Sequence, residues 1–343
     1  MAFEPATRKA LPVHISLTGR TGSGKTLSAL LMARGLVGPD GNIFGICTER
    51  GRMSLYADRE DLKGSNGISF YADELHPPFT PQRYKEKIDE AARLAKPGDC
   101  IVIDSGSHEW SGLGGCIDMA ADIDPTGKKG ALAWTMPKRL HKRYLNSTVQ
   151  APCHVIITLR GGNKLIAVTD EQGKVKYAEA PDLVPEAEKS FIYEMTISAT
   201  IDDQTHIARF TKLPDPLVGK LANKVIDKSS GEVVRAWVNS GIAVDVTLQS
   251  ERTRLRAAAE EGEFALRKAW ELLSRAHKLA LKDMLEDELK SIAAAADEAI
   301  AQRTASAAEP GYDDDLPVTR RIESERFPDD GPAASAYTDL VTQ

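Results

Sequence analysis

The chain has 343 residues, enough for one large domain or two smaller ones. Hydrophobic residues make up 42% of it and charged residues 27%, which is ordinary for a protein that buries a sizeable core. The net charge of −6 excludes a global basic field, so any contact with nucleic acid must be local. Residues 1–11 contain no apolar targeting segment and no run of 18 apolar residues occurs. We therefore expect no signal peptide, no membrane span and a cytoplasmic location.

The four cysteines show no C-x-x-C spacing, and three of them lie in or beside apolar strand-like runs. Small buried hydrophobic side chains are the expected role of such cysteines. This pattern argues against a zinc site or a disulfide framework and fits a reducing compartment. The cysteines are Cys47, Cys100, Cys116 and Cys153.

The first predicted strand covers residues 13–18, and residues 27–34 predict the start of a helix. Between them the sequence follows G-x-x-x-x-G-K-T, the phosphate-binding P-loop pattern. Backbone N–H groups of such a loop surround phosphate oxygens, Lys25 is expected to reach the β- and γ-phosphates, and the Thr26 hydroxyl is expected to bind Mg²⁺. The sequence therefore predicts a site for ATP and Mg²⁺. Its expected nucleotide contacts are Gly19, Arg20, Thr21, Gly22, Ser23, Gly24, Lys25 and Thr26.

Strand-like and helix-like segments alternate up to about residue 160. The predicted strands are 43–47, 67–71, 100–104 and 154–159, and the predicted helices are 81–94 and 131–149. Continuous apolar strands that alternate with helices indicate a parallel sheet covered on both faces. We therefore predict an α/β fold with a mainly parallel sheet.

Acidic residues follow two of these strands. Asp104 closes the apolar strand 100–104 and is the candidate Walker B acid, which would hold Mg²⁺. Glu49 follows the strand 43–47 at the carboxyl edge of the sheet, where it could polarise the attacking water. The alternative for Glu49 is a structural salt bridge in its loop. Glu109, just past Asp104, is the rival candidate for activating water, and with His108 it could equally belong to a loop anchored by Trp110.

The pattern changes from about residue 161 to residue 240, where two hairpin signals predict a β-rich extension of the core. The first hairpin carries glycines and basic residues, a composition that suits a phosphate backbone, although a solvated hairpin would look the same. The candidate DNA contacts are Arg160, Lys164, Lys174 and Lys176. A second basic cluster lies at residues 128–129 and 138–143, and one helix face for it is plausible but not required.

Residues 251–303 are rich in Ala, Glu, Lys, Leu and Arg, with apolar residues at helical spacing from Leu266 to Leu289. They predict two or three helices in a small module. Residues 304–343 are rich in Ala, Ser, Pro and Asp, and we expect them to form a disordered acidic tail.

Several segments together resemble RecA-type recombinases. Residues 44–58 are similar to the segment that carries the catalytic glutamate of that family, and Asp104-Ser105 resembles its Walker B ending. The strand 155–159 and the basic residues after it resemble the strand and loop that carry the γ-phosphate switch and the second DNA-binding loop. More narrowly, the signature Asp-Ser-x-x-His-Glu-Trp at 104–110 resembles a phage-type AAA/RecA-like ATPase family, some relatives of which act in recombination and single-strand annealing.

The resemblance implies a RecA-like P-loop core at residues 12–245, after an N-terminal arm at 1–11 and before the helical module at 251–303 and the tail at 304–343. It implies an ATPase of phage DNA recombination or replication that couples ATP to binding or annealing of single-stranded DNA, in the host cytoplasm if phage-encoded. It also implies a homo-oligomer, and a recombination or replication protein as a partner of the C-terminal module or tail. Two features depart from the family: Thr158, Leu159 or Arg160 stands where its switch glutamine would be, and its N-terminal polymerisation helix is absent.

Two other functions fit the P-loop. A P-loop kinase of small molecules would need an acceptor pocket and a lid with arginines, and no compact arginine-rich lid is evident. A nucleotide-dependent scaffold would bind ATP tightly with little turnover. Release of phosphate without an added acceptor distinguishes hydrolysis from both alternatives.

Overall fold

The computed structural model describes residues 6–163, 165–169, 175–179, 183–243 and 245–308. Residues 1–296 form one compact unit, and a second unit starts at residue 297. Among the described residues, no helix is both long and apolar enough to cross a membrane. The predicted acidic tail lies outside the described residues from residue 309 onward.

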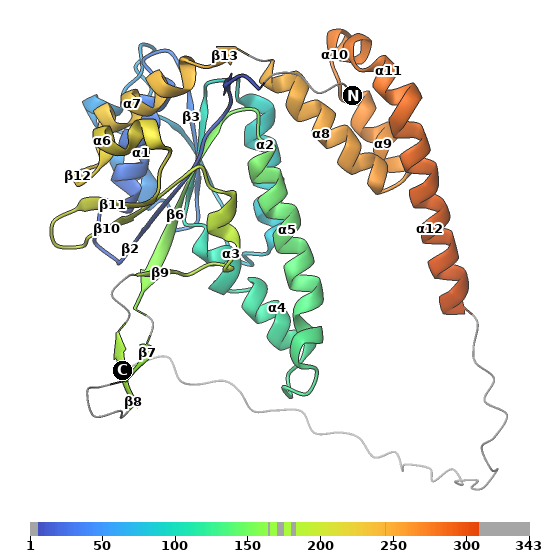
Figure 1. Ribbon diagram of the computed structural model, residues 1–343, viewed down its shortest axis with the longest axis horizontal. Helices are drawn as coiled ribbons and strands as arrows, with labels where there is room; N and C mark the ends of the chain where they lie inside the picture. Colours follow the sequence, from blue (N-terminus) through green and yellow to red (C-terminus); the bar gives the residue numbers. More distant parts are fainter. Residues whose placement is uncertain (1–5, 164, 170–174, 180–182, 244, 309–343) are drawn as a thin grey trace, which may run out of the picture. The chain divides into compact units, whose positions relative to one another are not determined.

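A twisted central sheet organises the larger unit (Figure 1). Its strand order is β12-β11-β10-β2-β6-β5-β3-β4, and β9 pairs with the end of β6. The six strands from β10 to β4 run parallel to one another, and β11 and β12 add an antiparallel edge. This confirms the predicted mainly parallel α/β core. The strands are β2 (His14–Gly19), β3 (Ile43–Cys47), β4 (Tyr71–Glu74), β5 (Cys100–Asp104), β6 (His154–Gly162), β9 (Val184–Pro185), β10 (Ile197–Ile201), β11 (Ile207–Lys212) and β12 (Lys224–Val225).

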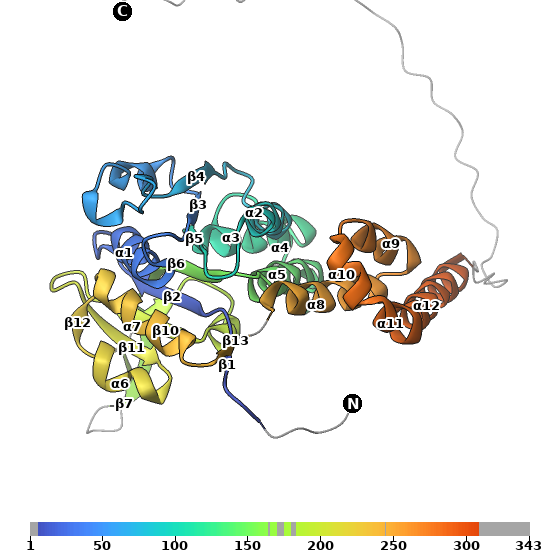
Figure 2. The ribbon, with the colours of Figure 1, turned by 90° about the horizontal axis from the view of Figure 1, so that it is seen from above.

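Helices cover both faces of the sheet, as Figure 2 shows from above. Successive residues of β5 divide between two apolar clusters, because side chains of a strand alternate between its faces. Val102 packs with α1 and α7, whereas Ile101 and Ile103 pack with α2 and α5. The sheet is therefore buried on both sides. The helices of this region are α1 (Lys25–Val37), α2 (Pro81–Leu94), α3 (Ser107–Ser111), α4 (Cys116–Ile123), α5 (Thr135–Val149), α6 (Asp215–Leu221) and α7 (Lys228–Asn239).

Three sequence predictions about these elements are wrong. The segment 67–71 is mostly a loop and β4 starts only at Tyr71, because the buried Arg34 guanidinium takes the Ser69 carbonyl oxygen at 2.8 Å. After Lys212 the predicted β-rich extension is mostly helical, because α6 and α7 follow with only the two-residue strand β12 between them. The helix expected from residue 131 begins with a 3₁₀ turn at Gly130–Trp134, so that Pro137 falls in the first turn of α5, where proline is tolerated.

The first predicted hairpin forms as β7 (Leu165–Thr169) and β8 (Val175–Glu179), which pair antiparallel. It follows β6 in the chain. The second predicted hairpin, with strands expected at residues 191–201 and 206–212, is β10 and β11. Its first strand begins only at Ile197, because Phe191–Glu194 form a 3₁₀ turn.

The C-terminal region is helical, as predicted, but it contains more segments than two or three helices. They are α8 (Val246–Glu260), α9 (Glu263–Glu271), α10 (Arg275–Ala280), α11 (Lys282–Met284), a π-helical turn (Leu285–Leu289) and α12 (Lys290–Ala308). The described helices share an apolar cluster of their own, which includes Leu255, Leu266, Leu273, Leu281 and Leu289. Leu273 and Leu281 lie in the short turns between successive helices, and Leu289 ends the π-helical turn.

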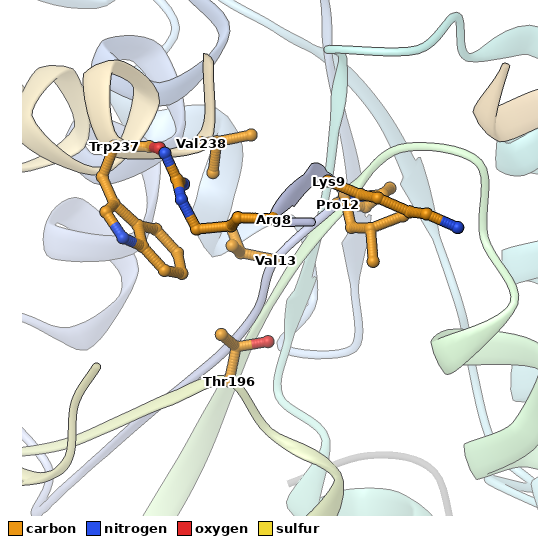
Figure 3. A pocket seen from close by; sticks show the side chains of 8 residues that line it. Arg8, Lys9, Pro12, Val13, Thr196, Trp237 and Val238 are labelled. Atoms are coloured by element: carbon orange, nitrogen blue, oxygen red, sulfur yellow. The ribbon is translucent and has the colours of Figure 1, made fainter. Parts of the chain in front are cut away.

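A cavity of about 220 Å³ lies at the amino ends of β2 and β10 (Figure 3). Val13 and Thr196, which directly precede β2 and β10, line it, and Trp237 lines it from α7. The Arg8 side chain lies over the Trp237 ring and donates to the Trp237 carbonyl oxygen at 2.6 Å. The cavity is at the opposite edge of the sheet from the P-loop, which follows the carboxyl end of β2.

Candidate functional site

The loop between β2 and α1 contains backbone conformations that only glycine adopts readily. Gly22 and Gly24 both have φ of 85°, a left-handed conformation that other residues rarely adopt. A Cβ on Gly19 would lie 2.3 Å from the Ser23 Oγ atom, so the tight turn also requires glycine there. Gly24 precedes α1 and supplies no side-chain cap, which leaves the first N–H groups of the helix available to an anion. The loop therefore fits a phosphate group.

Lys25 begins α1, and its ammonium group lies over the loop. The Nζ atom donates to the Arg20 carbonyl oxygen at 2.7 Å. Burial lowers the pKa of Lys25, and the nearby carboxylates of Asp104 and Glu49 act in the opposite direction. The positive charge of Lys25 is thus surrounded by the P-loop and by the two acids that the sequence singled out.

Asp104 ends β5 and is 1% exposed. One carboxylate oxygen accepts a hydrogen bond from the Thr26 hydroxyl at 2.7 Å, and the other accepts one from the Thr158 hydroxyl on β6. Burial raises the pKa of Asp104, and the hydrogen bonds from Thr158 and Thr26 oppose that shift. A hydroxyl and a carboxylate in contact beside a phosphate-binding loop are suitable ligands for Mg²⁺.

Sequence reasoning missed the part played by Thr158. It lies on β6, which is inserted between β2 and β5, so its hydroxyl reaches Asp104 from the strand next to the P-loop strand. The available signal was the one hydroxyl in the predicted strand 154–159, next to three apolar residues. A fully buried hydroxyl needs a partner, and a charged residue at the end of a neighbouring strand can provide it.

Glu49 follows β3 and lies near the same site. Its Oε1 atom is 3.1 Å from the Arg160 Nη2 atom, and its Oε2 atom is 3.7 Å from the Arg52 guanidinium. The Glu49 side chain is 20% exposed. The structure therefore places Glu49 beside Lys25 and Asp104, and it also gives Glu49 the salt bridges that the alternative interpretation expects.

Glu109 lies on α3 and has a different environment. It is 1% exposed, and its carboxylate accepts from the Cys116 thiol at 3.3 Å and contacts His141 Nδ1 at 2.9 Å. Cys116 begins α4 and His141 is on α5, so these contacts join three helices. The three side chains are close enough to hold a metal ion, and Glu109 hydrogen-bonds to both of the others. Among the described residues, the buried His141 Nε2 atom has no hydrogen-bond partner. Glu109 is directed into the protein rather than toward Lys25.

His108 belongs to a hydrogen-bond network next to Glu49. Its Nδ1 atom lies 2.7 Å from the Thr48 hydroxyl, which in turn accepts a hydrogen bond from the Ser105 backbone N–H at 2.8 Å. The ring stacks on Phe79, and burial lowers the pKa of His108. Thr48 and Ser105 directly follow β3 and β5, so this network fixes the two strand ends against each other. No motif in the sequence indicated the contact between Thr48 and His108.

The candidate DNA contacts are described only in part. Arg160 lies on β6 and Lys176 on β8, whereas Lys164 and Lys174 lie outside the described residues. Within the second basic cluster, the cations of residues 138–143 lie on one face of α5, whereas residues 128–129 precede this helix. The cations on α5 are all exposed and are spaced by one, three or four residues, whereas His141 and Tyr144 face inward. The exposed cations are Lys138, Arg139, Lys142 and Arg143.

The chain is similar to proteins of one known family. A family model described as an AAA domain matches residues 11–214, which is more than half of the chain. A comparison with curated proteins found no match. Among solved structures, the RadB recombinase is 16% identical with a TM-score of 0.33, and the similarity covers 61% of this chain and 84% of RadB. A KaiC-like protein from Pyrococcus horikoshii is 14% identical with a TM-score of 0.30, covering 62% of this chain and 90% of that protein.

Proposed function

The chain belongs to the AAA domain family, and we propose that it binds ATP with Mg²⁺ and hydrolyses the γ-phosphate in a reaction coupled to single-stranded DNA. One observation carries the proposal: Lys25, Thr26 and Asp104 come together at a glycine loop that leaves the N–H groups of α1 available. These are the parts that phosphoryl transfer requires, because that reaction depends on positioning and on stabilisation of charge.

Each residue of the site then has a chemical role. The loop N–H groups and Lys25 neutralise the phosphate oxygens. Thr26 and Asp104 would hold Mg²⁺, which would neutralise charge that develops during the transfer. Glu49 is the proposed base that orients water, because its carboxylate is partly exposed near Lys25, whereas the Glu109 carboxylate is buried among three helices. Thr158 holds Asp104 from the opposite side.

The DNA part of the proposal depends on exposed basic groups on β6 and α5. Arg160 follows the buried part of β6 and precedes the β7–β8 hairpin. The exposed basic face of α5 provides further cations, and α5 contains no acidic residue. Contacts of this kind bind a phosphate backbone without reading its sequence. We propose a role in DNA recombination or replication, as a homo-oligomer, with the C-terminal helices and tail as the attachment for a partner protein.

The test is ATP turnover with and without a single-stranded oligonucleotide, measured as phosphate release with no added acceptor. We expect turnover in the wild-type protein, an increase with the oligonucleotide, and turnover at background level in Lys25→Ala. Equal rates with and without DNA over a range of salt concentrations would contradict the coupling. Tight ATP binding with neither ADP formation nor phosphate release would favour the scaffold. Formation of ADP without phosphate release, dependent on an added small molecule that becomes phosphorylated, would favour the kinase. A mass measurement in the presence of ATP tests the oligomer.

A further inference from the structure

Three buried side chains of different chemistry meet where α3, α4 and α5 pack together (Figure 1). They are Glu109 on α3, Cys116 at the start of α4 and His141 on α5, and each is 4% exposed or less. One ligand atom from each residue lies within 4.8 Å of the other two. A carboxylate, a thiol and an imidazole are the kinds of side chain that bind zinc in proteins.

The distances in this cluster match the size of a zinc coordination sphere. Zinc binds carboxylate oxygen and imidazole nitrogen at about 2.0–2.2 Å and thiolate sulfur at about 2.3 Å, almost always with tetrahedral geometry. Neighbouring ligand atoms of such a tetrahedron are therefore about 3.3–3.8 Å apart. One Glu109 oxygen lies 3.3 Å from the Cys116 Sγ atom, and the other lies 2.9 Å from His141 Nδ1. Small rotations of the side chains would therefore admit one ion.

Hydrogen bonds alone leave the cluster incompletely paired. A thiol is a weak donor, yet the Cys116 thiol is what one oxygen of the buried Glu109 carboxylate faces. Among the described residues, His141 is the only basic side chain within ion-pair distance of Glu109. The His141 Nε2 atom and the Tyr144 hydroxyl, both on α5, are buried and have no partner in the part of the chain that the structure describes. Buried carboxylates are normally paired with a cation or bound to a metal, and unpaired buried polar atoms are rare.

The three side chains could bind Zn²⁺ without burying a net charge. Because His141 Nε2 accepts no hydrogen bond from a described residue, it can carry the ring proton while the Nδ1 lone pair binds the ion. Cys116 would bind as a thiolate, and its proton would leave to the solvent. The Glu109 carboxylate and the thiolate would together balance the two positive charges of the ion. This removes the main cost of placing a divalent cation in a protein interior.

We propose that Glu109, Cys116 and His141 form a structural site for one Zn²⁺ ion, which fastens α3 and α4 to α5. A water molecule enclosed with the ion would complete the tetrahedron. The spacing of the cysteines argued against zinc, because the ligands come from three helices and include only one cysteine. Glu109 follows Asp104 closely in the chain, so the ion would also steady the segment after β5. The proposal depends neither on ATP hydrolysis nor on DNA.

The experiment measures metal in the full-length protein, purified without ATP in a thiol-free reductant from cells grown with zinc or with cobalt. The ion enters during folding in such cells, which suits a buried site. We expect about one zinc ion per chain by elemental analysis, as for a single structural site. The cobalt protein should show the charge-transfer band of a cobalt–thiolate bond. That band cannot come from the proposed Mg²⁺ site, whose donors are a hydroxyl and a carboxylate.

Variants identify the ligands. Cys116→Ser should lose the charge-transfer band and bind zinc about 100-fold more weakly or worse, since residues that only support a metal ligand already contribute about 10- to 100-fold. Cys153→Ala is the matched control: it removes another fully buried thiol and should keep both the metal and the band. Glu109→Gln should lose more stability relative to the wild type in zinc than in a chelator, because only the zinc-loaded wild type has the ion to lose.

Wild-type protein that folds with neither zinc nor cobalt bound would overturn the proposal and leave a hydrogen-bonded cluster. A band that survives in Cys116→Ser would overturn it too, as would a loss of stability in Glu109→Gln that is the same with zinc and with chelator. If Cys116→Ser does not fold, the cobalt spectrum of the wild type still decides. The reason is that these three residues are the only cluster among the described ones that could hold an ion in this way.

Discussion

Glu49 and Glu109 are the two candidates for the base that activates water, and their surroundings distinguish them. Glu49→Gln keeps the shape of the side chain but removes the carboxylate, so we expect turnover to fall by about 100-fold or more, the usual contribution of general base catalysis. Nucleotide affinity should stay near the wild-type value, because the P-loop and Lys25 are untouched. Binding of a fluorescent ATP analogue and phosphate release, measured on the same preparation, check both parts.

Glu109→Gln is the matched control. Its carboxylate contacts His141 and Cys116 in the protein interior, and loss of the charged hydrogen bond should lower stability by about 1.5–3 kcal/mol. Turnover per folded molecule should change little. If Glu109→Gln stops turnover while Glu49→Gln remains active, the assignment of the base is wrong.

At the level of elements, α1 and α7 cross with very little space between their backbones. A Cβ on Gly35 would lie 1.9 Å from the Lys228 carbonyl oxygen, so Gly35→Ala forces the helices apart. We expect a loss of about 1–3 kcal/mol in the free energy of unfolding, the usual cost of overpacking. Denaturant unfolding measures this loss, and turnover should decrease as well, since α1 carries Lys25 and Thr26.

Gly219→Ala provides the comparison for that prediction. Gly219 is in α6, and a Cβ there would contact nothing within 4 Å. Because alanine is the better helix former, this change should stabilise the protein by about 0.5–1 kcal/mol. If both variants lose stability equally, close packing of α1 against α7 is not the cause.

The parts of the fold that follow local rules could be predicted from the sequence. The strands 43–47 and 100–104 agree with β3 and β5 residue for residue, because each is a short apolar run with a sharp end. The helix 81–94 is α2, which has proline in its first turn and an apolar stripe. The local sequence pattern was enough for these elements, because the residues that specify each one are neighbours in the chain.

Contacts between distant segments could not be predicted in this way. The segment 67–71 resembles a strand, but Arg34, more than 30 residues earlier, binds its carbonyl groups and holds much of it as a loop. In the candidate site, too, contacts between distant segments could not be predicted. The P-loop and the two acids at strand ends were recognisable, whereas the contact of Asp104 with Thr158 and that of Glu49 with Arg160 depend on which strands are neighbours in the sheet.

For the molecule as a whole, two of the buried histidines, His14 and His154, should contribute strongly to its stability in acid. His14 on β2 and His154 on β6 are 9% and 6% exposed, and burial lowers the pKa of each to about 4. In the unfolded chain each histidine would titrate near 6.5. Between these values the unfolded state binds more protons, so stability is complete above about pH 6.5 and decreases as the pH falls toward 4.

Each shift corresponds to a loss of up to about 3 kcal/mol in the free energy of unfolding, although the two histidines are coupled and their effects need not add. Asp104, whose pKa is raised by burial, opposes this trend in part. Urea unfolding between pH 7 and pH 4.5 measures the dependence. His154→Asn, which keeps an acceptor for the Val13 N–H, should weaken it clearly, whereas the exposed His76→Asn should leave it as in the wild type. Wild-type stability that stays constant over this interval would mean that the two histidines take up protons in the folded protein as readily as in the unfolded chain. The packing around β2 and β6 would then have to accommodate two cations at pH 4.5.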